Sequence, residues 1–467
     1  MSRFTLDELI QASGGELFSG PRAIELAGVS IDSRTLRPGE AFVAIRGHRL
    51  DGHAFCAAAL AGGARALVVA DRGAVSPTPD VAVVLVKDTT RALQRLAGFH
   101  RARFQLPVVA VTGSNGKTTT KDLAAAVLSV RFRVLKSEGS LNNQWGVPLT
   151  LLRLSSEHQA LVLELGMNAP REIATLAALA RPSVGVLTNI GPVHLEFLGS
   201  LEGVQKAKGE LVEAIGPEGT VVLNADDPLV LALAKEARGR VVTFGLEGSA
   251  HVGARGVVTK ESGGIAFTLV IGVSSAPVLL PLAGRHNVSN ALAAAAVGSL
   301  FGLAPREIAD GLARVRPAIH RLTWIEAGGV RILDDCYNAN PRSVAAALQT
   351  LTESTGGRAI AVLGDMLELG DAAEAAHREV GRLAARLGVD GLYGFGPLSR
   401  HTVAGARAAG LHAAHTASDL EALVKEMRRE VRLGDRILVK GSRGMRMERL
   451  VERLQGSGED RRGEEHA

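Results

Sequence analysis

Short apolar runs alternate with helix-spaced segments along most of the chain. Between residues 107 and 316 these runs are VVAVTG, ALVLELG, VGVLTNIG, GTVVLNAD and RVVTFG, and helical patterns separate the first several of them. Runs that are apolar throughout, rather than at every second position, are typical of parallel strands covered by helices on both faces. The pattern therefore predicts a parallel sheet with helices on both sides in this part of the chain.

The flanking parts of the chain carry the same alternation in separate blocks. Residues 1–106 contain the strand candidates AFVAI, ALVVA and VAVVLV, which indicate a small α/β unit. In residues 317–457 the runs RILDD, AIAVLGD, GLYGFG and RILVKGS indicate a second doubly wound, Rossmann-like sheet. Residues 250–282 predict a short antiparallel insertion, and the polar tail 458–467 is predicted to be disordered. We expect an α/β protein of three domains, 1–106, 107–316 and 317–457.

The composition argues against several classes of protein. Only two cysteines occur, Cys56 and Cys336, which disfavours a disulfide framework and predicts a reducing, cytoplasmic location. The N-terminus MSRFTLDELI lacks the apolar core of a signal peptide, and no apolar stretch is long enough to span a membrane. The net charge of +5 suits anionic ligands. Because acidic residues are interspersed and aromatic residues make up only 3% of the chain, nucleic acid is not an expected partner.

The segment VTGSNGKT, residues 111–118, has the sequence of a phosphate-binding loop. It follows a predicted strand and opens a predicted helix, so its backbone N–H groups would surround phosphate oxygens. Lys117 would contact the β and γ phosphates of ATP, and the Thr118 hydroxyl would bind Mg²⁺. The usual pattern has glycine where this chain has Val111, and Gly113 supplies the turn instead. The predicted ATP contacts in this loop are Gly113, Ser114, Asn115, Gly116, Lys117, Thr118 and Thr119.

Three further polar residues follow predicted strands or lie on a predicted helix. Glu164 ends the run ALVLE, where a carboxylate is well placed to hold Mg²⁺, although a glutamate at a strand end can also face solvent. His194 follows the run VGVLTNI, and a lone histidine is often structural. Lys208 lies on a helical segment, where a lysine is most often a solvated surface charge. The residue patterns alone leave both interpretations open at each position.

A series of motifs in a fixed order narrows the choice. The chain contains VTGSNGKTTTK, LNNQWGVPLT, LELGM, TNIGPVHLEFLGS followed by AKGE, NADDP, GRHNVSNALAA, DDCYNANPRS, GDMLELG and VKGSRGMRME. Together they resemble the Mur ligase family, the ATP-dependent amino-acid ligases of peptidoglycan synthesis. DDCYNANPRS and GDMLELG are most similar to the branch that adds D-alanyl-D-alanine to UDP-N-acetylmuramoyl-tripeptide.

The resemblance implies a reaction and a division of labour between the domains. The N-terminal domain would bind the UDP end of the UDP-N-acetylmuramoyl-tripeptide, the central domain ATP, and the C-terminal domain the incoming D-alanyl-D-alanine. The carboxylate of the tripeptide would attack the γ-phosphate to give an acyl phosphate, and the amine would then displace phosphate to form an amide, leaving ADP. Such a step depends on positioning and on electrostatic stabilisation, because an anion approaches a polyanion. We expect a monomer.

The resemblance also implies two Mg²⁺ ions and a modified lysine. Thr118 and Glu164 would hold the first ion, and His194 would help to hold the second, with Glu164 shared between them. Lys208 would carry a carbamate formed from CO₂. An unmodified lysine is cationic and cannot ligate Mg²⁺, whereas a carbamate is an anion with two oxygen atoms, which is the kind of ligand that Mg²⁺ prefers. Lys117, His194 and Lys208 are thus the expected catalytic residues.

The remaining assignments concern the nucleotide and the two other substrates. His286, Asn287 and Asn290 open a predicted helix and would lie at the adenine, although an asparagine there can also cap the helix. Arg321 would reach the ATP phosphates or the ribose. Asp335 would bind the ribose or position Arg321.

The substrate contacts fall in three segments. In SIDSRTLRPGEAFVAIRGH an ordinary polar loop is the alternative to a uridine-nucleotide site, and in LNNQWG simple turn chemistry is the alternative to contact with the muramoyl-peptide or the γ-phosphate. Residues at the end of RILVKGS would contact the acyl phosphate or the dipeptide carboxylate. The predicted substrate-binding residues are Ser33, Arg34, His48, Asn142, Asn143, Lys440, Ser442 and Arg443.

Three alternative functions remain. A regulatory nucleotide switch would hydrolyse ATP without any amine and would give no role to His194 or Lys208. A scaffolding homologue without activity would be expected to have lost Lys117 or Thr118, and both are present. Within the family, the nearest alternative is the ligase that adds the third peptide residue, diaminopimelate or lysine. The sequence does not identify the third residue of the accepted peptide.

Overall fold

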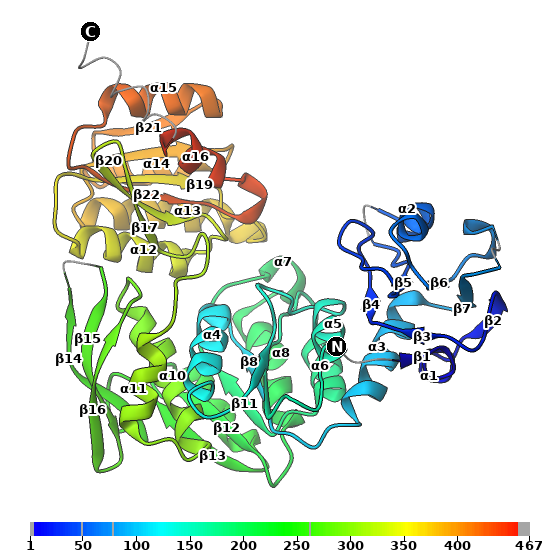
Figure 1. Cartoon of the computed structure of the whole chain (residues 1–467). Coiled ribbons are helices and arrows are strands. Elements are labelled where there is room, and N and C mark those ends of the chain that lie inside the picture. The colour runs from blue at the N-terminus through cyan, green and yellow to red at the C-terminus, as the bar shows by residue number, and fades with distance from the viewer. Residues whose placement is uncertain (1–3, 48–49, 77–78, 261–262, 456–467) are drawn as a thin grey trace, which may run out of the picture.

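The computed structural model describes residues 4–47, 50–76, 79–260 and 263–455. Figure 1 shows three units in chain order, with the C-terminal unit above the central one and the N-terminal unit beside it. His48 and the tail 458–467 lie outside the described residues. Within the described residues, no helix combines the length and the apolar character that a membrane crossing requires. The predicted α/β class with three units is confirmed, and the exact domain boundaries stay predictions.

The N-terminal unit is built on a five-stranded sheet in the order β2-β7-β6-β5-β4. Strands β4 to β7 run parallel, and β2 pairs with β7 antiparallel. A separate antiparallel pair, β1 with β3, lies beside it. The elements are β1 (Phe4–Thr5), α1 (Leu6–Ser13), β2 (Glu16–Ser19), β3 (Glu25–Leu26), β4 (Val29–Ser30), β5 (Ala41–Val43), η1 (Gly52–Phe55), α2 (Cys56–Ala61), β6 (Ala66–Val69), η2 (Arg72–Ala74), β7 (Ala82–Leu85) and α3 (Thr89–Arg101).

The central unit has a nine-stranded sheet in the order β16-β15-β14-β13-β12-β11-β8-β10-β9. Strands β8 to β14 are parallel, whereas β14, β15 and β16 form an antiparallel meander. The predicted insertion is therefore confirmed, and it extends the parallel sheet at one edge. The strands are β8 (Val108–Thr112), β9 (Val134–Lys136), β10 (Ala160–Glu164), β11 (Val184–Leu187), β12 (Thr220–Asn224), β13 (Arg240–Phe244), β14 (Val252–Thr259), β15 (Ile265–Ile271) and β16 (Ser274–Leu280).

Helices cover both faces of this sheet, as the apolar runs predict. Along β8, Val108 and Ala110 belong to the apolar cluster on one face, and Val109 and Val111 belong to the cluster on the other. Successive side chains of a strand point to opposite faces, so a strand buried on both sides must be apolar at every position. The helices are α4 (Lys117–Leu128), α5 (Gly146–Leu151), α6 (Glu172–Ala180), α7 (Leu195–Leu198), α8 (Leu201–Ala214), α9 (Pro228–Leu231), η3 (Ala232–Glu236), α10 (His286–Leu300) and α11 (Pro305–Ala313).

The C-terminal unit has a six-stranded sheet in the order β17-β18-β22-β19-β20-β21. Only the edge strand β17 is antiparallel to its neighbour, which gives the doubly wound sheet that the sequence predicts. The elements are β17 (Thr323–Ala327), β18 (Val330–Asp335), α12 (Pro341–Glu353), β19 (Ala359–Gly364), η4 (Gly370–Ala372), α13 (Ala373–Arg386), β20 (Gly391–Phe395), α14 (Ser399–Ala408), β21 (Ala414–Ala417), α15 (Leu420–Glu430), β22 (Arg436–Lys440), η5 (Arg443–Met445) and α16 (Glu448–Gln455).

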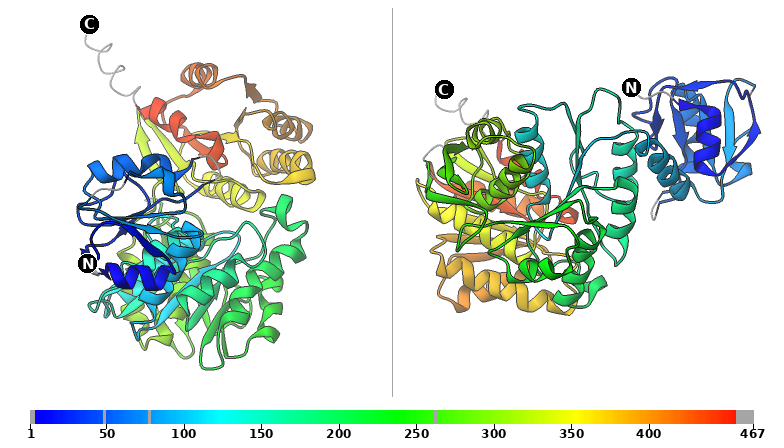
Figure 2. Two further views of the ribbon diagram at one scale, coloured as in Figure 1. Left: turned by 90° about the vertical axis from the view of Figure 1, so that its right-hand side faces the viewer. Right: turned by 90° about the horizontal axis from the view of Figure 1, so that it is seen from below.

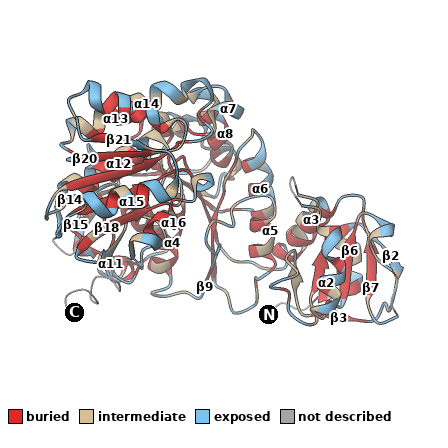
Figure 3. Cartoon of the chain, turned by 90° about the horizontal axis from the view of Figure 1, so that it is seen from above, coloured by how far each residue is buried: buried red, intermediate tan, exposed pale blue. Residues whose placement is uncertain are grey.

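The central unit meets its two neighbours through different elements. Helix α3 leaves the N-terminal unit and packs against α5 and α6 of the central unit. On the other side, η4 of the C-terminal unit contacts α7 of the central unit, and α12 lies on the side of the C-terminal unit that faces the central one (Figures 1 and 2). Figure 3 shows that the strands of the three sheets are mostly buried, whereas the outer helices alternate between buried and exposed positions. The carboxyl ends of β8, β10 and β11 lie on the side of the central sheet that meets the C-terminal unit.

Candidate active site

The phosphate-binding loop connects β8 to α4 through two glycines that no other residue could replace without strain. Gly113 and Gly116 have φ angles of 148° and 79°, which side chains disfavour. A Cβ atom on Gly113 would lie 1.9 Å from Thr188 Oγ1, and one on Gly116 would lie 2.3 Å from Asn290 Oδ1. Val111, where the usual pattern has glycine, lies within β8 and pairs with Glu164 and Val186 on the neighbouring strands. The loop thus turns two residues later than the usual pattern suggests.

The segment after β11 braces this loop. Asn189 Oδ1 accepts a hydrogen bond from the Asn115 N–H at 2.9 Å, and Thr188 Oγ1 donates to the Asn115 carbonyl at 2.6 Å. Ser114 Oγ donates to the carbonyl of Gly191 and accepts from its N–H, at 3.1 and 2.8 Å. Asn189 lies in the motif TNIG but was not among the predicted site residues. The signal that could have identified it is an asparagine two residues after the end of a buried strand.

The predicted first metal ligands lie side by side. Thr118 Oγ1 donates a hydrogen bond to Glu164 Oε2 at 2.7 Å, and the Asn142 side chain donates to Glu164 Oε1 at 2.7 Å. Lys117 Nζ donates to the carbonyls of Gly113 and Ser114, at 2.9 and 3.3 Å. Burial lowers the pKa of Lys117, and Arg321 lowers it further, while Glu164 opposes that shift. The hydroxyl and carboxylate oxygens provide the hard donors that Mg²⁺ requires.

The two adjacent asparagines of the motif LNNQWG have different partners. Asn142 contacts Glu164, as described above, and its carbonyl accepts a hydrogen bond from the Gly166 N–H at 2.8 Å. Asn143 Oδ1 accepts from the N–H groups of Trp145 and Gly146, at 3.1 and 2.9 Å, where α5 begins. Asn143 therefore performs turn and capping chemistry in this structure, whereas Asn142 lies in the site.

Lys208 is buried in α8, with only 2% of its surface exposed. Among the described residues, none forms a hydrogen bond or salt bridge with its ammonium group. Burial lowers the pKa of Lys208 well below its usual range, and repulsion by Lys117 lowers it further. The interpretation of Lys208 as a solvated surface charge is therefore wrong. Lys206, two residues earlier on the same helix, is exposed.

His194 joins the central unit to the C-terminal unit. Its Nδ1 lies 2.8 Å from Oε2 of Glu368, a residue of the motif GDMLELG that the sequence analysis did not single out. The hydrogen bond with His194 lowers the pKa of the Glu368 carboxyl. Among the described residues, no group of three or more histidine, cysteine, aspartate or glutamate side chains is arranged to hold a metal ion. A metal ion bound here would therefore need oxygen donors of other kinds as well, such as the Thr118 hydroxyl.

The residues assigned to adenine open α10 on the rim of the same cavity. His286 is the first residue of the helix, and burial together with repulsion by Lys440 lowers its pKa to about 4. Asn287 donates to the Ala283 carbonyl at 2.7 Å, and Asn290 donates to Asn287 Oδ1 at 2.8 Å. The interpretation of an asparagine as the helix cap is wrong, because Arg285 occupies that position without a side-chain bond.

Arg321 comes from the linker before β17 and reaches the phosphate-binding loop. Its Nη2 donates to Thr118 Oγ1 at 3.0 Å. The guanidinium lies 3.9 Å from the ring centroid of Tyr337, which is a cation–π contact that the sequence analysis missed. Arg443 lies farther from the same ring, at 6.0 Å. The motif DDCYNANPRS contains Tyr337, but nothing in the sequence pairs it with an arginine sixteen residues earlier.

Asp335 and Lys440 form a buried ion pair at the carboxyl ends of β18 and β22. Lys440 Nζ also donates to the Asn338 carbonyl at 2.8 Å. Burial raises the pKa of Asp335, although Lys440 opposes that shift. The other Asp335 oxygen accepts from the Leu322 N–H at 3.3 Å, so Asp335 anchors the linker that carries Arg321. The pair lies on the cavity wall.

The other predicted substrate residues lie in two places. Ser442 is buried and its Oγ accepts from the Leu367 N–H at 2.9 Å, while Arg443 is exposed on the cavity rim. Arg34 belongs to the N-terminal unit, away from this cavity, and forms an exposed salt bridge with Asp32 at 2.6 Å. That contact lowers the pKa of Asp32 to about 2. Ser33 is partly exposed beside them.

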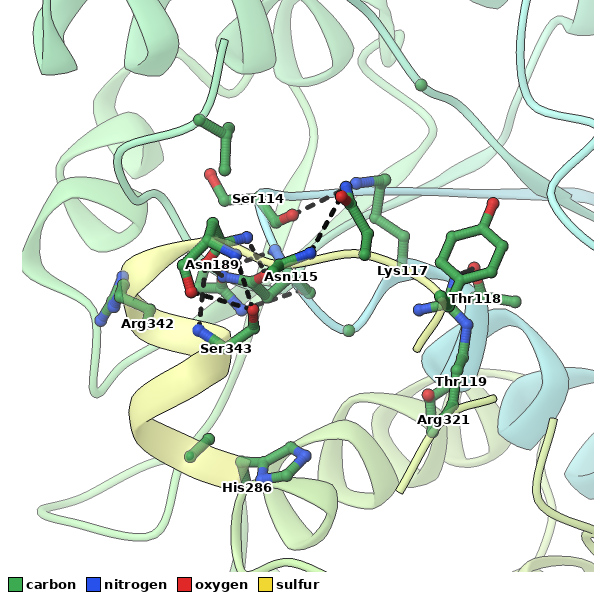
Figure 4. Close-up of a pocket in the computed structure, with 18 of the residues that line it drawn as sticks. Ser114, Asn115, Lys117, Thr118, Thr119, Asn189, His286, Arg321, Arg342 and Ser343 are labelled. Carbon is green, nitrogen blue, oxygen red and sulfur yellow. Dashed lines mark hydrogen bonds between the residues drawn. The ribbon is translucent and has the colours of Figure 1, made fainter. Parts of the chain in front are cut away.

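The N-terminus of α12 docks directly onto the phosphate-binding loop. The side-chain amides of Asn115 and Asn340 form reciprocal hydrogen bonds of 3.3 and 2.7 Å. Arg342 donates to the Ile190 carbonyl at 2.6 Å and lies 3.3 Å from Asp227 Oδ2. Figure 4 shows Arg342 and Ser343 on this helix beside Asn115 and Asn189. Asn340 and Arg342 were not among the predicted site residues, because their partners lie more than a hundred residues away in the sequence.

These groups enclose a polar cavity of about 650 Å³ between the central and C-terminal units. The loop residues Ser114 to Thr119 form one wall, α10 another, and the C-terminal unit the third. Figure 4 shows Lys117, Thr118 and Arg321 on one side of this space and His286 on another. A cavity of this volume, lined by helix N-termini and cations, suits a nucleoside triphosphate.

Family models cover most of the chain. The Mur ligase middle domain matches residues 111–298, the model described as Mur ligase, glutamate ligase domain matches 320–443, and the model described as Mur ligase family, catalytic domain matches 25–101. The three matches fall on the central, C-terminal and N-terminal units respectively.

Full-length relatives and solved structures agree with these matches. UDP-N-acetylmuramoyl-tripeptide--D-alanyl-D-alanine ligase from Escherichia coli is 40% identical over 98% of this chain and 100% of its own length. MurF from Acinetobacter baumannii superposes with a TM-score of 0.88 at 33% identity, covering 98% of this chain and 99% of that one. MurF ligase from Thermotoga maritima in complex with ADP superposes with a TM-score of 0.81 at 30% identity, covering 93% and 98%. The chain belongs to the Mur ligase family.

Proposed function

We propose that the chain is an ATP-dependent ligase that joins D-alanyl-D-alanine to UDP-N-acetylmuramoyl-tripeptide, with ADP and phosphate as the other products. The observation that carries this proposal is the similarity to D-alanyl-D-alanine-adding ligases along almost the whole chain, including the C-terminal unit. The MurF ligase from Thermotoga maritima was solved with ADP, which supports ATP as the nucleotide.

Each unit has a proposed partner. The central unit, 107–316, would hold ATP with Gly116, Lys117 and Thr118, and α10 would flank the adenine. The C-terminal unit, 317–457, would hold the dipeptide, because its residues form the cavity wall opposite the loop. The N-terminal unit, 1–106, would hold the uridine nucleotide, with Ser33 and Arg34 as proposed contacts. The cytoplasmic location and the monomeric state stay predictions.

The chemistry would require concentrated positive charge. A carboxylate must approach the γ-phosphate of ATP, and Lys117 and Arg321 place two cations beside Thr118. Lys117 lies on the loop and helix of the central unit, whereas Arg321 would join it when the C-terminal unit lies against the loop, and the two would then stabilise developing charge. Mg²⁺, held by Thr118 and Glu164, would supply further charge neutralisation when bound. The amine would then attack the acyl phosphate, and phosphate would leave.

We infer that Lys208 carries a carbamate. A neutral amine adds to CO₂ and releases one proton, and the product is an anion with two oxygens. The lowered pKa of Lys208 favours the neutral amine, which is rare for a lysine in water. Its ammonium has no hydrogen-bonding or ionic partner among the described residues, so an unmodified charged lysine would be strongly disfavoured there. The carbamate would be an anionic ligand of the second ion, together with His194 and Glu164.

The decisive experiment measures phosphate release with one amine at a time. With UDP-N-acetylmuramoyl-tripeptide and ATP, turnover should require D-alanyl-D-alanine. Equal turnover with free diaminopimelate or lysine on a UDP-muramoyl-dipeptide would instead identify the ligase that adds the third residue. Rapid hydrolysis without any amine would identify a nucleotide switch. Comparing tripeptides that end in diaminopimelate and in lysine would also identify the accepted third residue.

A further inference from the structure

Two strained residues face each other across the junction between the central and C-terminal units. His194 and Glu368 have φ angles of 53° and 63°, in the left-handed region that side chains disfavour. Each costs on the order of 1 kcal/mol, and such strain persists only where the surrounding structure imposes it. The two side chains meet, with His194 Nδ1 lying 2.8 Å from Glu368 Oε2. Two residues with left-handed backbone therefore contribute to the same contact.

The stability of the protein does not account for this contact. The His194 side chain is 23% exposed and that of Glu368 is 54% exposed. Ion pairs and hydrogen bonds at such exposed positions add little to the free energy of unfolding. Other contacts that join the two units are already present at Arg342 and Asn340. The pair must be explained by what it does to the orientation of the imidazole.

A histidine ring with one nitrogen bound to a carboxylate has only its other nitrogen available for a second ligand. Nδ1 of His194 faces Glu368, so Nε2 is the nitrogen that remains. A carboxylate partner of this kind fixes the tautomer and the ring orientation of metal-binding histidines. His194, Glu368 and Glu164 all line the same cavity. Glu368, however, belongs to the C-terminal unit, whereas the other two belong to the central unit.

We propose that Glu368 is a positioning residue that fixes the His194 ring with Nε2 available to the second divalent cation, and that it does so only when the C-terminal unit lies against the central one. This proposal rests on the metal-binding role given to His194 in the proposed function. It makes the second cation site dependent on domain closure. The second ion would thus be held firmly only when the unit that carries the incoming amine is in place.

The test uses Mn²⁺ as the probe, titrated into the full-length protein with ADP and followed by electron paramagnetic resonance. The variants are Glu368→Ala, Glu368→Gln and His194→Ala. Asp371→Ala is the matched control, because it removes the same charge from an exposed residue three positions away. Thermal unfolding of each variant checks that it is folded.

In Glu368→Ala the weaker of two Mn²⁺ sites should lose about 10- to 100-fold in affinity, while the tighter site stays unchanged. Glu368→Gln should bind within about threefold of the parent, since its amide oxygen still accepts a hydrogen bond from Nδ1. Asp371→Ala should match the parent protein. A uniform loss at both sites in Glu368→Ala would overturn the positioning role.

The variant His194→Ala separates this inference from the proposed function. If His194→Ala loses the weaker site and Glu368→Ala keeps it, the positioning role is wrong while the metal role of His194 stands. If His194→Ala binds both ions as the parent does, the metal role of His194 is wrong, and the inference about Glu368 fails with it.

Discussion

The central unit is joined to its two neighbours by junctions of opposite character. On the N-terminal side, one apolar cluster runs without interruption from the first unit into the central one, and it includes Leu93 of α3, Leu151 of α5 and Leu176 of α6. Two buried side chains of α3 reinforce it, since His100 contacts the Leu154 carbonyl at 3.0 Å and Arg101 donates to the Ala180 carbonyl at 2.9 Å.

The junction on the C-terminal side is polar. The apolar clusters of the C-terminal unit begin at Leu322 and contain no described residue of the central unit. Among the described residues, the hydrogen bonds that cross this junction join the pairs Asn115–Asn340, Arg342–Ile190, Arg342–Asp227, Arg321–Thr118 and His194–Glu368. All of them lie at the cavity that we assign to ATP.

The difference between the apolar and the polar junction determines which of the two outer units can move. Separating an apolar junction exposes surface at a cost of roughly 25 cal/mol for each Å². Hydrogen bonds of a polar junction can be exchanged for bonds to water, at a net cost of only about 0.5–1.5 kcal/mol each. We therefore expect the N-terminal unit to be fixed and the C-terminal unit to open and close over ATP. Changes at the first junction should affect stability, and changes near the second should affect turnover.

The largest effect is expected at Lys208, which is buried and is repelled by the ammonium group of Lys117. Lys208→Ala should reduce turnover by at least about 10³-fold, because the proposed carbamate is an anionic metal ligand. Added acetate or formate should restore part of the activity by supplying an oxygen ligand, and Lys206→Ala should remain close to the parent protein. Phosphate release measures the activity of both variants, with and without the added carboxylate. Full activity in Lys208→Ala would refute the carbamate.

The next effect concerns the apolar junction. Leu96 lies on α3 and is 2% exposed within the shared cluster. Leu96→Ala should lower the free energy of unfolding by about 2–5 kcal/mol, because it removes buried methyl groups and leaves a cavity. Turnover of the folded fraction should change less than about twofold. Denaturant unfolding and phosphate release measure the two quantities. A large loss of turnover without loss of stability would contradict the proposed division of roles.

At the polar junction we expect Arg342→Ala to lower turnover more than stability, which is the reverse of the expectation for Leu96→Ala. Its guanidinium is half-exposed, and its bonds to Ile190 and Asp227 exist only when the two units meet. Arg342→Ala should reduce turnover by roughly tenfold, equivalent to about 1.4 kcal/mol, while the melting temperature shifts little. Arg446→Ala, which changes an exposed arginine in the same unit, serves as the control. A marked drop in melting temperature with normal turnover would show that Arg342 is a stability residue.

The smallest effect is a pH dependence of stability at the apolar junction. Burial lowers the pKa of His100, so the unfolded chain takes up its proton at a higher pH than the folded protein. Stability from this residue is therefore complete above about pH 6.5 and is lost as the pH falls through that value toward the lower folded-state pKa. Each unit of pKa depression corresponds to about 1.4 kcal/mol. His100→Met should flatten this part of the profile of unfolding free energy against pH, and an unchanged slope would contradict it.

Local patterns in the sequence were sufficient for most of the buried parallel strands and for the phosphate-binding loop, but not for edge strands such as β2, β17 and β21. They also put Thr118 and Glu164 at neighbouring strand ends, and the metal-binding role of these two residues stays a prediction. These features depend on periodicity, or on residues at the ends of neighbouring strands, and both are encoded within short segments. The tight turn at Gly113 could also be predicted from the residues of the loop itself. The assignment of Lys208 needed the resemblance, because a lysine on a helix carries no sign of its burial.

The polar junction could not be predicted in the same way. Asn115 and Asn340 are separated by 225 residues, and His194 and Glu368 by 174. No periodicity links such positions, because they meet only after two separate sheets have formed and docked. Tyr337 was missed for a related reason, since its contact with Arg321 depends on how β18 and the linker fold back on each other.

The most direct test of the account measures how far each junction moves. Spin labels at exposed positions, introduced as Asp80→Cys, Val273→Cys and Leu433→Cys, place one probe on each unit, and both native cysteines are buried. Double electron–electron resonance should give one narrow distance for the pair at 80 and 273, unchanged by ADP and Mg²⁺. The pair at 273 and 433 should show a broad distribution that narrows when ADP and Mg²⁺ are added. Equal behaviour of the two pairs, or a fixed distance between 273 and 433, would contradict the claim that only the polar junction opens.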